Sequence, residues 1–308
     1  MRVKRDVSDK LMRWATRAAV MVATTLVVTK AYVWWLSGSV AVLGSLTDSA
    51  LDLAASMVTL FAVKAAISPA DDDHRFGHGK AEALAGLFQS AVMAGSAVFL
   101  ALRATENLWE PKTIQASELV IQVSVLAIIL SIALVAFQTY VIKKTKSLAI
   151  EGDHLHYTGD LLLNIGVIAA AYSSSLGWIY ADGVFGLLIA AYILYGSNNI
   201  ARPAINMLMD RELPREDREA IFNMALGNPK VQGLHELKTR LSGRDIFIQM
   251  HIEVDSTMTV RDAHFISDEV EGVIGEVYPD AEIIIHVDPP SVKSADLTFA
   301  ELGHKDDV

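Results

Sequence analysis

Six long apolar stretches occupy the first two thirds of the chain, and short polar breaks separate them. They run near residues 14–36, 40–66, 82–108, 118–142, 147–174 and 178–202. Each is at least as long as the ~20 residues that a helix needs to cross a bilayer. The pattern predicts a polytopic α-helical membrane domain of six transmembrane helices, covering residues 1–209.

The pattern of apolar positions changes after residue 209, to that of a small α+β domain over residues 210–290. Residues 245–254 alternate strictly, which is typical of a half-buried strand. Helices are predicted over 214–226 and 260–277, and further strands over 233–241 and 281–288. The order αββαβ resembles that of a ferredoxin-like metallochaperone domain. Residues 291–308 are predicted to form a disordered tail.

Composition supports the membrane assignment and excludes several classes of protein. The 308 residues are 52% hydrophobic and only 20% charged, and the mean hydropathy is +0.34. A formal charge of −10 argues against nucleic acid as a partner. Because the chain has no cysteine, it can form neither disulfides nor a thiolate metal site.

Lysine and arginine sort between the two sides of the predicted membrane domain. They precede the first stretch, lie between the second and third and between the fourth and fifth, and follow the sixth, with Lys112 as the main exception. The positive-inside rule therefore predicts that both termini are cytoplasmic. The first stretch is read as a span rather than a cleaved signal, because it is too long, contains Lys30 and ends in Trp34-Trp35.

Four polar residues lie deep inside two of the apolar stretches. Asp48 and Asp52 are in the second stretch, and His156 and Asp160 are in the fifth. The i,i+4 spacing places each pair on one helix face, and both pairs lie near the middle of the bilayer. An ionised Asp there costs about 2.5–3.5 kcal/mol even on the lenient insertion scale. Three carboxylates and one imidazole suit a tetrahedral Zn²⁺; the alternative is simple hydrogen bonding between helices.

Two further groups have metal-ligand chemistry. Asp71, His74 and His78 lie between the second and third stretches, in a loop that could equally be a solvated helix cap. The C-terminal domain contributes a larger set, for which ordinary surface histidines are the alternative: His235, His251, His264, His286 and Asp288.

Four segments together resemble the cation diffusion facilitator family over nearly the whole chain. They are Gly38-Ser39-Val40 with Asp48 to Asp52, Pro69 to Glu82, His154 to Asp160, and Ile285 to Pro289. The resemblance implies a homodimeric antiporter of the bacterial inner membrane that exchanges Zn²⁺ for protons. It implies that the three groups are a transport site, a loop site and a cytoplasmic binuclear site bridged by Asp288.

The resemblance also implies a charge interlock between Lys80 and Asp210 at the dimer interface; two unrelated charges at helix ends are the alternative. Many eukaryotic zinc members carry a His where this chain has Asp48, and they have a His-rich loop that this chain lacks. The oxygen-rich site weakens any expectation of strict Zn²⁺ selectivity, because such a site also tolerates Cd²⁺, Fe²⁺ or Mn²⁺.

Alternating access around the midplane site is the expected mechanism, with no enzymatic activity. Metal binds deprotonated ligands, so protonation releases it. His156, with a reference pKa of about 6.5, is the expected pH-responsive ligand. Two rival functions remain: a membrane metallohydrolase, for which the H-E-x-x-H motif is absent, and a metal sensor, which would not need ionisable residues inside the membrane.

Overall fold

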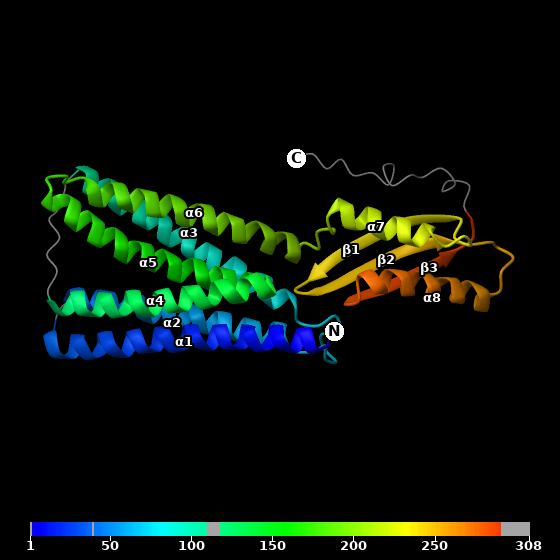
Figure 1. Ribbon diagram of the computed structural model, residues 1–308, viewed down its shortest axis with the longest axis horizontal. Helices are drawn as coiled ribbons and strands as arrows, with labels where there is room; N and C mark the ends of the chain where they lie inside the picture. Colours follow the sequence, from blue (N-terminus) through cyan, green and yellow to red (C-terminus); the bar gives the residue numbers. More distant parts are fainter. Residues whose placement is uncertain (1, 39, 110–117, 291–308) are drawn as a thin grey trace. The chain divides into compact units, whose positions relative to one another are not determined.

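The computed structural model describes residues 2–38, 40–109 and 118–290. The chain divides between Ile205 and Asn206 into two compact units (Figure 1). The predicted tail, residues 291–308, lies outside the described residues. The N-terminal unit is helical, and the C-terminal unit combines two helices with a sheet.

Six long helices follow the six predicted apolar stretches. They are α1 (Arg2–Ser37), α2 (Val40–Ala66), α3 (Lys80–Trp109), α4 (Glu118–Thr145), α5 (Leu148–Ser175) and α6 (Ala181–Leu208). Two helices extend well beyond the apolar residues that predicted them. The helix α1 begins at Arg2, and α6 continues through Pro203 to Leu208. Apolar length sets how much of a helix suits the bilayer, and it does not set where the helix ends.

Five of these helices are long and apolar enough to cross a membrane: α1, α2, α3, α4 and α6. The helix α5 is as long, with 28 residues, but it carries Glu151, Asp153 and Asp160 as well as two histidines. These carboxylates and histidines lower the mean hydropathy of α5. The structure therefore supports a membrane unit with five clearly apolar helices, and the sixth span stays a prediction.

The first two helices form an antiparallel pair (Figure 1). The helix α1 ends where Gly38 adopts a left-handed conformation, with φ 59°, and its backbone N–H donates to Trp34 O at 2.8 Å. Glycine adopts this conformation without the steric cost that a Cβ would bring.

The helix α5 contacts α1, α2, α3 and α4. The second and fifth predicted spans are thus neighbours, as a shared site requires.

The C-terminal unit has the predicted order of elements: α7 (Arg215–Leu226), β1 (Gly233–Ser242), β2 (Asp245–Glu253), α8 (Val260–Val277) and β3 (Ala281–Asp288). The sheet order is β1-β2-β3, with β1 and β2 antiparallel and β2 and β3 parallel. Apolar side chains of α7 and α8 share one core with alternate residues of the strands, such as Ile248, Met250 and Ile252. The alternate strand residues, including His251, lie on the other face of the sheet.

Candidate metal centres

Three groups of His and Asp side chains come together in the part of the chain that the structure describes. In each group the ligand atoms lie within 4.8 Å of one another. The groups are Asp52, His156 and Asp160; Asp71, His74 and His78; and His235, His251 and Asp288. Each falls within one of the three sets predicted from the sequence.

The membrane group is organised around the imidazole of His156. Its Nε2 lies 3.0 Å from Asp52 Oδ1 and 3.6 Å from Asp160 Oδ2. A tetrahedral Zn²⁺ with bonds of 2.0–2.1 Å separates its ligands by about 3.3 Å. Both distances from Nε2 are therefore close to the spacing of ligands around one small cation.

Neighbouring side chains fix the orientation of this imidazole. His156 is buried, its Nδ1 lies 3.1 Å from Met93 Sδ on α3, and the Tyr157 ring packs edge-on against it. Its Nε2 is buried and faces both carboxylates. A buried imidazole nitrogen between two carboxylates has the arrangement of a cation ligand.

Asp48, the fourth predicted member, is outside this group. It lies one turn before Asp52 on α2, and its side chain is exposed. It still lies near enough to Asp160 to interact with it electrostatically. Its role as a ligand stays a prediction.

A buried polar network that sequence reasoning missed lies beside the membrane group. Asp153 Oδ1 accepts from Ser56 Oγ at 3.0 Å, and Asp153 Oδ2 accepts from Gln138 Nε2 at 2.7 Å. Tyr157 Oη lies 3.1 Å from Ser56 Oγ and donates to Ala19 O. These bonds join α1, α2, α4 and α5. The signal was present in the sequence, because Asp153 is a third carboxylate in the stretch that also holds Asp160.

The loop group is built around the carboxylate of Asp71. Its Oδ1 accepts the backbone N–H groups of Asp73 and His74, a local turn typical of Asp. His74 Nδ1 and His78 Nε2 each lie 3.3 Å from one of its two oxygens. The pKa of Asp71 is held below its usual value, mainly by the hydrogen bond from the His74 backbone. Asp71 is thus an anion that holds two imidazoles at metal-ligand spacing.

The C-terminal group is centred on Asp288 at the end of β3. Its Oδ2 lies 2.9 Å from His251 Nδ1 and 3.5 Å from His235 Nε2, and its Oδ1 lies 3.1 Å from His286 Nε2. The sheet register explains the cluster, because His251 pairs with both His235 and His286. The pKa of Asp288 is lowered, mainly by the hydrogen bond from His251, and further by the neighbouring imidazoles. Two oxygens facing different histidines suit a bridging carboxylate.

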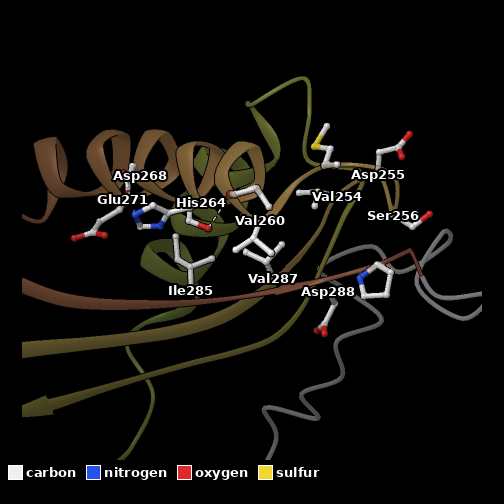
Figure 2. Close-up of a pocket in the computed structure, with 14 residues that line it drawn as sticks. Val254, Asp255, Ser256, Val260, His264, Asp268, Glu271, Ile285, Val287 and Asp288 are labelled. Carbon is white, nitrogen blue, oxygen red and sulfur yellow. Dashed lines mark hydrogen bonds and ion pairs between the residues drawn. The ribbon is translucent and has the colours of Figure 1, made fainter.

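His264 is the predicted member that the structure does not bring to this cluster. It lies on α8, 72% exposed, with its Nε2 3.7 Å from Asp268 Oδ2. Both residues line a groove of about 620 Å³ between α8 and β3, together with Asp288. Figure 2 shows Ile285 and Val287 pointing toward α8 and Asp288 pointing away from it. His264 as a ligand therefore stays a prediction.

Glu253 is a carboxylate near this cluster that the sequence did not single out. It is 2% exposed, pairs in register with Asp288, and places Oε1 3.7 Å from His235 Nε2. Gly233 opposite makes room for it, since a Cβ there would lie 2.7 Å from Glu253 Oε2. The alternation of residues 245–254 did place Glu253 on the face of His251, and that was the available signal.

The two residues of the predicted charge interlock lie in different units. Lys80 begins α3, and Asp210 follows α6. Within its own unit Asp210 Oδ1 lies 3.2 Å from Arg240 Nη1. The pairing with Lys80 stays a prediction.

Comparison with known proteins decides the family. Residues 16–209 match the cation efflux transmembrane domain, and residues 213–290 match the cytoplasmic domain of cation efflux proteins, the ZT_dimer family. The chain belongs to the cation diffusion facilitator family. It is therefore a cation efflux transporter and not an enzyme, which excludes the metallohydrolase alternative.

Relatives of this transporter are similar along nearly their whole length. The chain is 41% identical to the cation-efflux pump FieF of Klebsiella pneumoniae over 286 residues, covering 93% of this chain and 95% of the relative. It is 42% identical to the FieF of Salmonella choleraesuis over 283 residues, covering 92% and 94%. Among solved structures, the metal-bound C-terminal domain of the CzcD transporter from Thermotoga maritima is 31% identical. It covers 26% of this chain and 100% of that one, with a TM-score of 0.25.

Proposed function

We propose that this transporter is a proton-coupled antiporter that exports Zn²⁺ from the cytoplasm, with Cd²⁺ and Fe²⁺ as further candidate substrates. The observation that carries the proposal is the group Asp52, His156 and Asp160 on two helices of the membrane unit. Carboxylates inside a membrane need a compensating cation or proton. A site that exchanges one for the other meets that need in every state of the cycle.

The donor set supports a divalent transition metal as the substrate. Imidazole favours Zn²⁺, Fe²⁺ and related ions over Ca²⁺ or Mg²⁺, while carboxylate oxygens broaden the range of ions accepted. We infer that Asp48 completes a tetrahedral site by turning toward Asp52 and Asp160, which lie on its own helix and on the neighbouring one. Preference for Zn²⁺ over Cd²⁺ or Fe²⁺ would then depend on how closely the four ligand atoms can approach the bound ion.

The proposed membrane arrangement has six spans in the bacterial inner membrane, with both termini in the cytoplasm. The helix α5 is the sixth span: its 28 residues are long enough, and its contacts with α1, α2, α3 and α4 shield its polar face from lipid. The cytoplasmic domain is ferredoxin-like and joins two copies as a homodimer, with Lys80 and Asp210 as the charge interlock. The described order of helices and the distribution of Lys and Arg support this topology.

The proposed mechanism is alternating access around the single membrane site. Metal loads from the cytoplasm onto deprotonated ligands, and protons taken up from the outer side displace it. An inward proton gradient then drives export. The loop group and the cytoplasmic group, bridged by Asp288, bind metal without transporting it; they stabilise the dimer and adjust transport to metal supply.

The test is flux in liposomes containing the purified protein, with Zn²⁺ movement and internal pH recorded together. Asp52→Ala and Asp160→Ala should each lose Zn²⁺ flux and the linked pH change while still inserting and dimerising. Asp73→Ala, an exposed loop carboxylate outside the three groups, is the matched control. Normal Zn²⁺ flux in Asp52→Ala would refute the site, and flux without any pH change would refute the antiport.

A further inference from the structure

A lysine in the first membrane helix is not explained by the ligands of the transport site. Lys30 lies on α1, seven residues before its end at Ser37, or about 10 Å along the helix. A lysine at that depth is costly unless it snorkels to the interface or finds partners in the protein. It is half-buried, and its direction therefore decides which of the two applies.

The Lys30 side chain turns into the protein. Its Nζ donates to Ser49 Oγ at 2.7 Å and to Ser45 O at 3.2 Å, both on α2. Ser49 is 2% exposed, and it lies between the two site carboxylates of α2, directly after Asp48 and three residues before Asp52. The ammonium is thus held by neutral oxygens at the level of the transport site.

All three carboxylates of the proposed site lie near enough to interact electrostatically with Lys30. They are Asp52, Asp160 and Asp48. An ammonium has no lone pair, so Lys30 cannot be a metal ligand. It can act only through its charge, and inside a membrane charge acts over a longer range than in water.

The charges of the site balance only when Lys30 is counted. Three ionised carboxylates with one divalent cation and a neutral imidazole leave one net negative charge. The Lys30 ammonium brings the metal-loaded site to neutrality. A buried net charge is unfavourable in a medium of low dielectric constant, so the balanced arrangement is the favourable one.

We propose that Lys30 is a fixed counter-charge of the transport site, which makes the loaded site neutral and weakens its hold on the divalent cation enough for release. The inference rests on the proposed function of the Asp52 group. Lys30 is a positioning residue of an electrostatic kind: the hydrogen bonds to Ser45 and Ser49 hold its ammonium beside the metal and away from the carboxylate oxygens.

The alternative is that Lys30 only ties α1 to α2. The two roles predict opposite changes in affinity. Removal of a tie would loosen the site and raise the Zn²⁺ concentration for half-maximal flux. Removal of a counter-charge would lower the Zn²⁺ concentration for half-maximal flux, because a positive charge that repels Zn²⁺ is gone. It would also slow turnover, because Zn²⁺ would then be released more slowly.

The experiment measures Zn²⁺ flux against concentration at pH 8 in liposomes for three variants. Lys30→Met and Lys30→Gln both remove the charge, and Gln keeps a hydrogen-bond donor. Both should lower the half-saturating Zn²⁺ concentration by about tenfold, as expected for loss of one unit charge near a buried cation, and both should lower the maximal rate. Lys30→Arg keeps the charge and should stay within about twofold of the parent.

If the half-saturating Zn²⁺ concentration is unchanged or raised in both neutral variants, the proposal that Lys30 is a counter-charge is overturned. Failure of both to insert while Lys30→Arg inserts would also overturn it, since that is the result of a structural tie. Asp52→Ala, measured in the same series, separates this inference from the one it rests on. An active Asp52→Ala refutes the transport site itself, whereas an inactive Asp52→Ala with a parent-like Lys30→Met refutes Lys30 alone.

Discussion

Single charged residues in the membrane unit are informative because each one carries a cost. A charge at the centre of a span costs about 2.5–3.5 kcal/mol on the lenient scale. Four of these residues have partners that offset the cost: Asp52 and Asp160 face His156, Asp153 accepts two hydrogen bonds, and Lys30 donates two. The pairing marks these positions as functional or architectural, because ordinary packing would use apolar side chains.

Glu253 gives a prediction at the same scale in the cytoplasmic domain. Its buried carboxylate lies 3.7 Å from His235 Nε2, on the side opposite to the bulk of the apolar core. We expect Glu253→Gln to weaken Zn²⁺ binding at the Asp288 group by about tenfold, because carboxylates next to a ligand histidine raise its basicity and fix its orientation. The measurement is Zn²⁺ titration of residues 213–290 by calorimetry.

The matched control for Glu253 is Glu282→Gln, an exposed carboxylate on the neighbouring strand β3. It should bind Zn²⁺ like the parent. Equal affinities in the two variants would mean that Glu253 has no part in the metal site and serves only to fill the space above Gly233.

The sequence predicted which residues could be ligands better than it predicted which of them lie together in the fold. Spacing and depth grouped Asp48 and Asp52 with His156 and Asp160, and the structure places the last three together. His264 and Glu253 show the limit. Histidine chemistry put His264 in the C-terminal set, yet α8 carries it to the other side of β3 from the side chain of Asp288. Glu253 joins the cluster only because the strand register brings it opposite Gly233 and Asp288, and pairing between strands is not visible in local periodicity.

At the scale of elements, small residues decide how closely the membrane helices approach. A Cβ at Gly183 on α6 would lie 2.8 Å from the backbone oxygen of Ala104 on α3, and one at Gly186 would lie 2.8 Å from Ala104 Cβ. Asp182 and Asn107 hydrogen-bond beside this contact. Close approach through small residues is a common way for membrane helices to pack, since burial of apolar surface gives little driving force there.

Gly183→Ala should therefore separate α3 from α6 and destabilise the membrane unit. The backbone of Ala104 cannot move aside as a flexible side chain would, so we expect a cost of about 1–3 kcal/mol, the usual range for overpacking. Thermal unfolding in detergent measures it. Gly95→Ala on α3, where a Cβ would meet nothing within 4 Å, is the control and should unfold like the parent. A parent-like melting temperature for Gly183→Ala would contradict the close contact.

Element types and order were predictable, and element ends were less so. The five elements of the C-terminal domain begin and end within a residue or so of their predicted limits, because turns and alternation mark them clearly. In the membrane unit the apolar stretches located every helix. They did not reveal that α1 begins at Arg2, since charged residues can extend a helix beyond the bilayer. The contacts of α5 with four other helices depend on packing, which hydropathy does not encode.

At the scale of the whole molecule, the chain combines a cation efflux transmembrane domain with a cytoplasmic domain that carries its own metal-ligand cluster. The cytoplasmic domain belongs to a family named for dimerisation. A metal that binds only the assembled form stabilises it in proportion to the logarithm of metal concentration over Kd. The Asp288 cluster is therefore expected to make dimer affinity depend on metal.

The last prediction tests that dependence in the full-length protein. Asp288 contacts three histidines through its two oxygens, so Asp288→Ala removes the centre of the cluster without touching the hydrophobic core of the domain. We expect Zn²⁺ to strengthen the parent dimer by about tenfold or more, as follows when Zn²⁺ is present well above its Kd. Asp288→Ala should lose this response, and its dimer without metal should be at least as strong as the parent's. Analytical ultracentrifugation in detergent, with and without Zn²⁺, measures both dimer affinities.

Glu282→Ala, which removes an exposed carboxylate from the same strand, is the control and should respond to Zn²⁺ like the parent. A full Zn²⁺ response in Asp288→Ala would show that the cluster does not link metal supply to assembly, and the regulatory role would then pass to the loop group of Asp71.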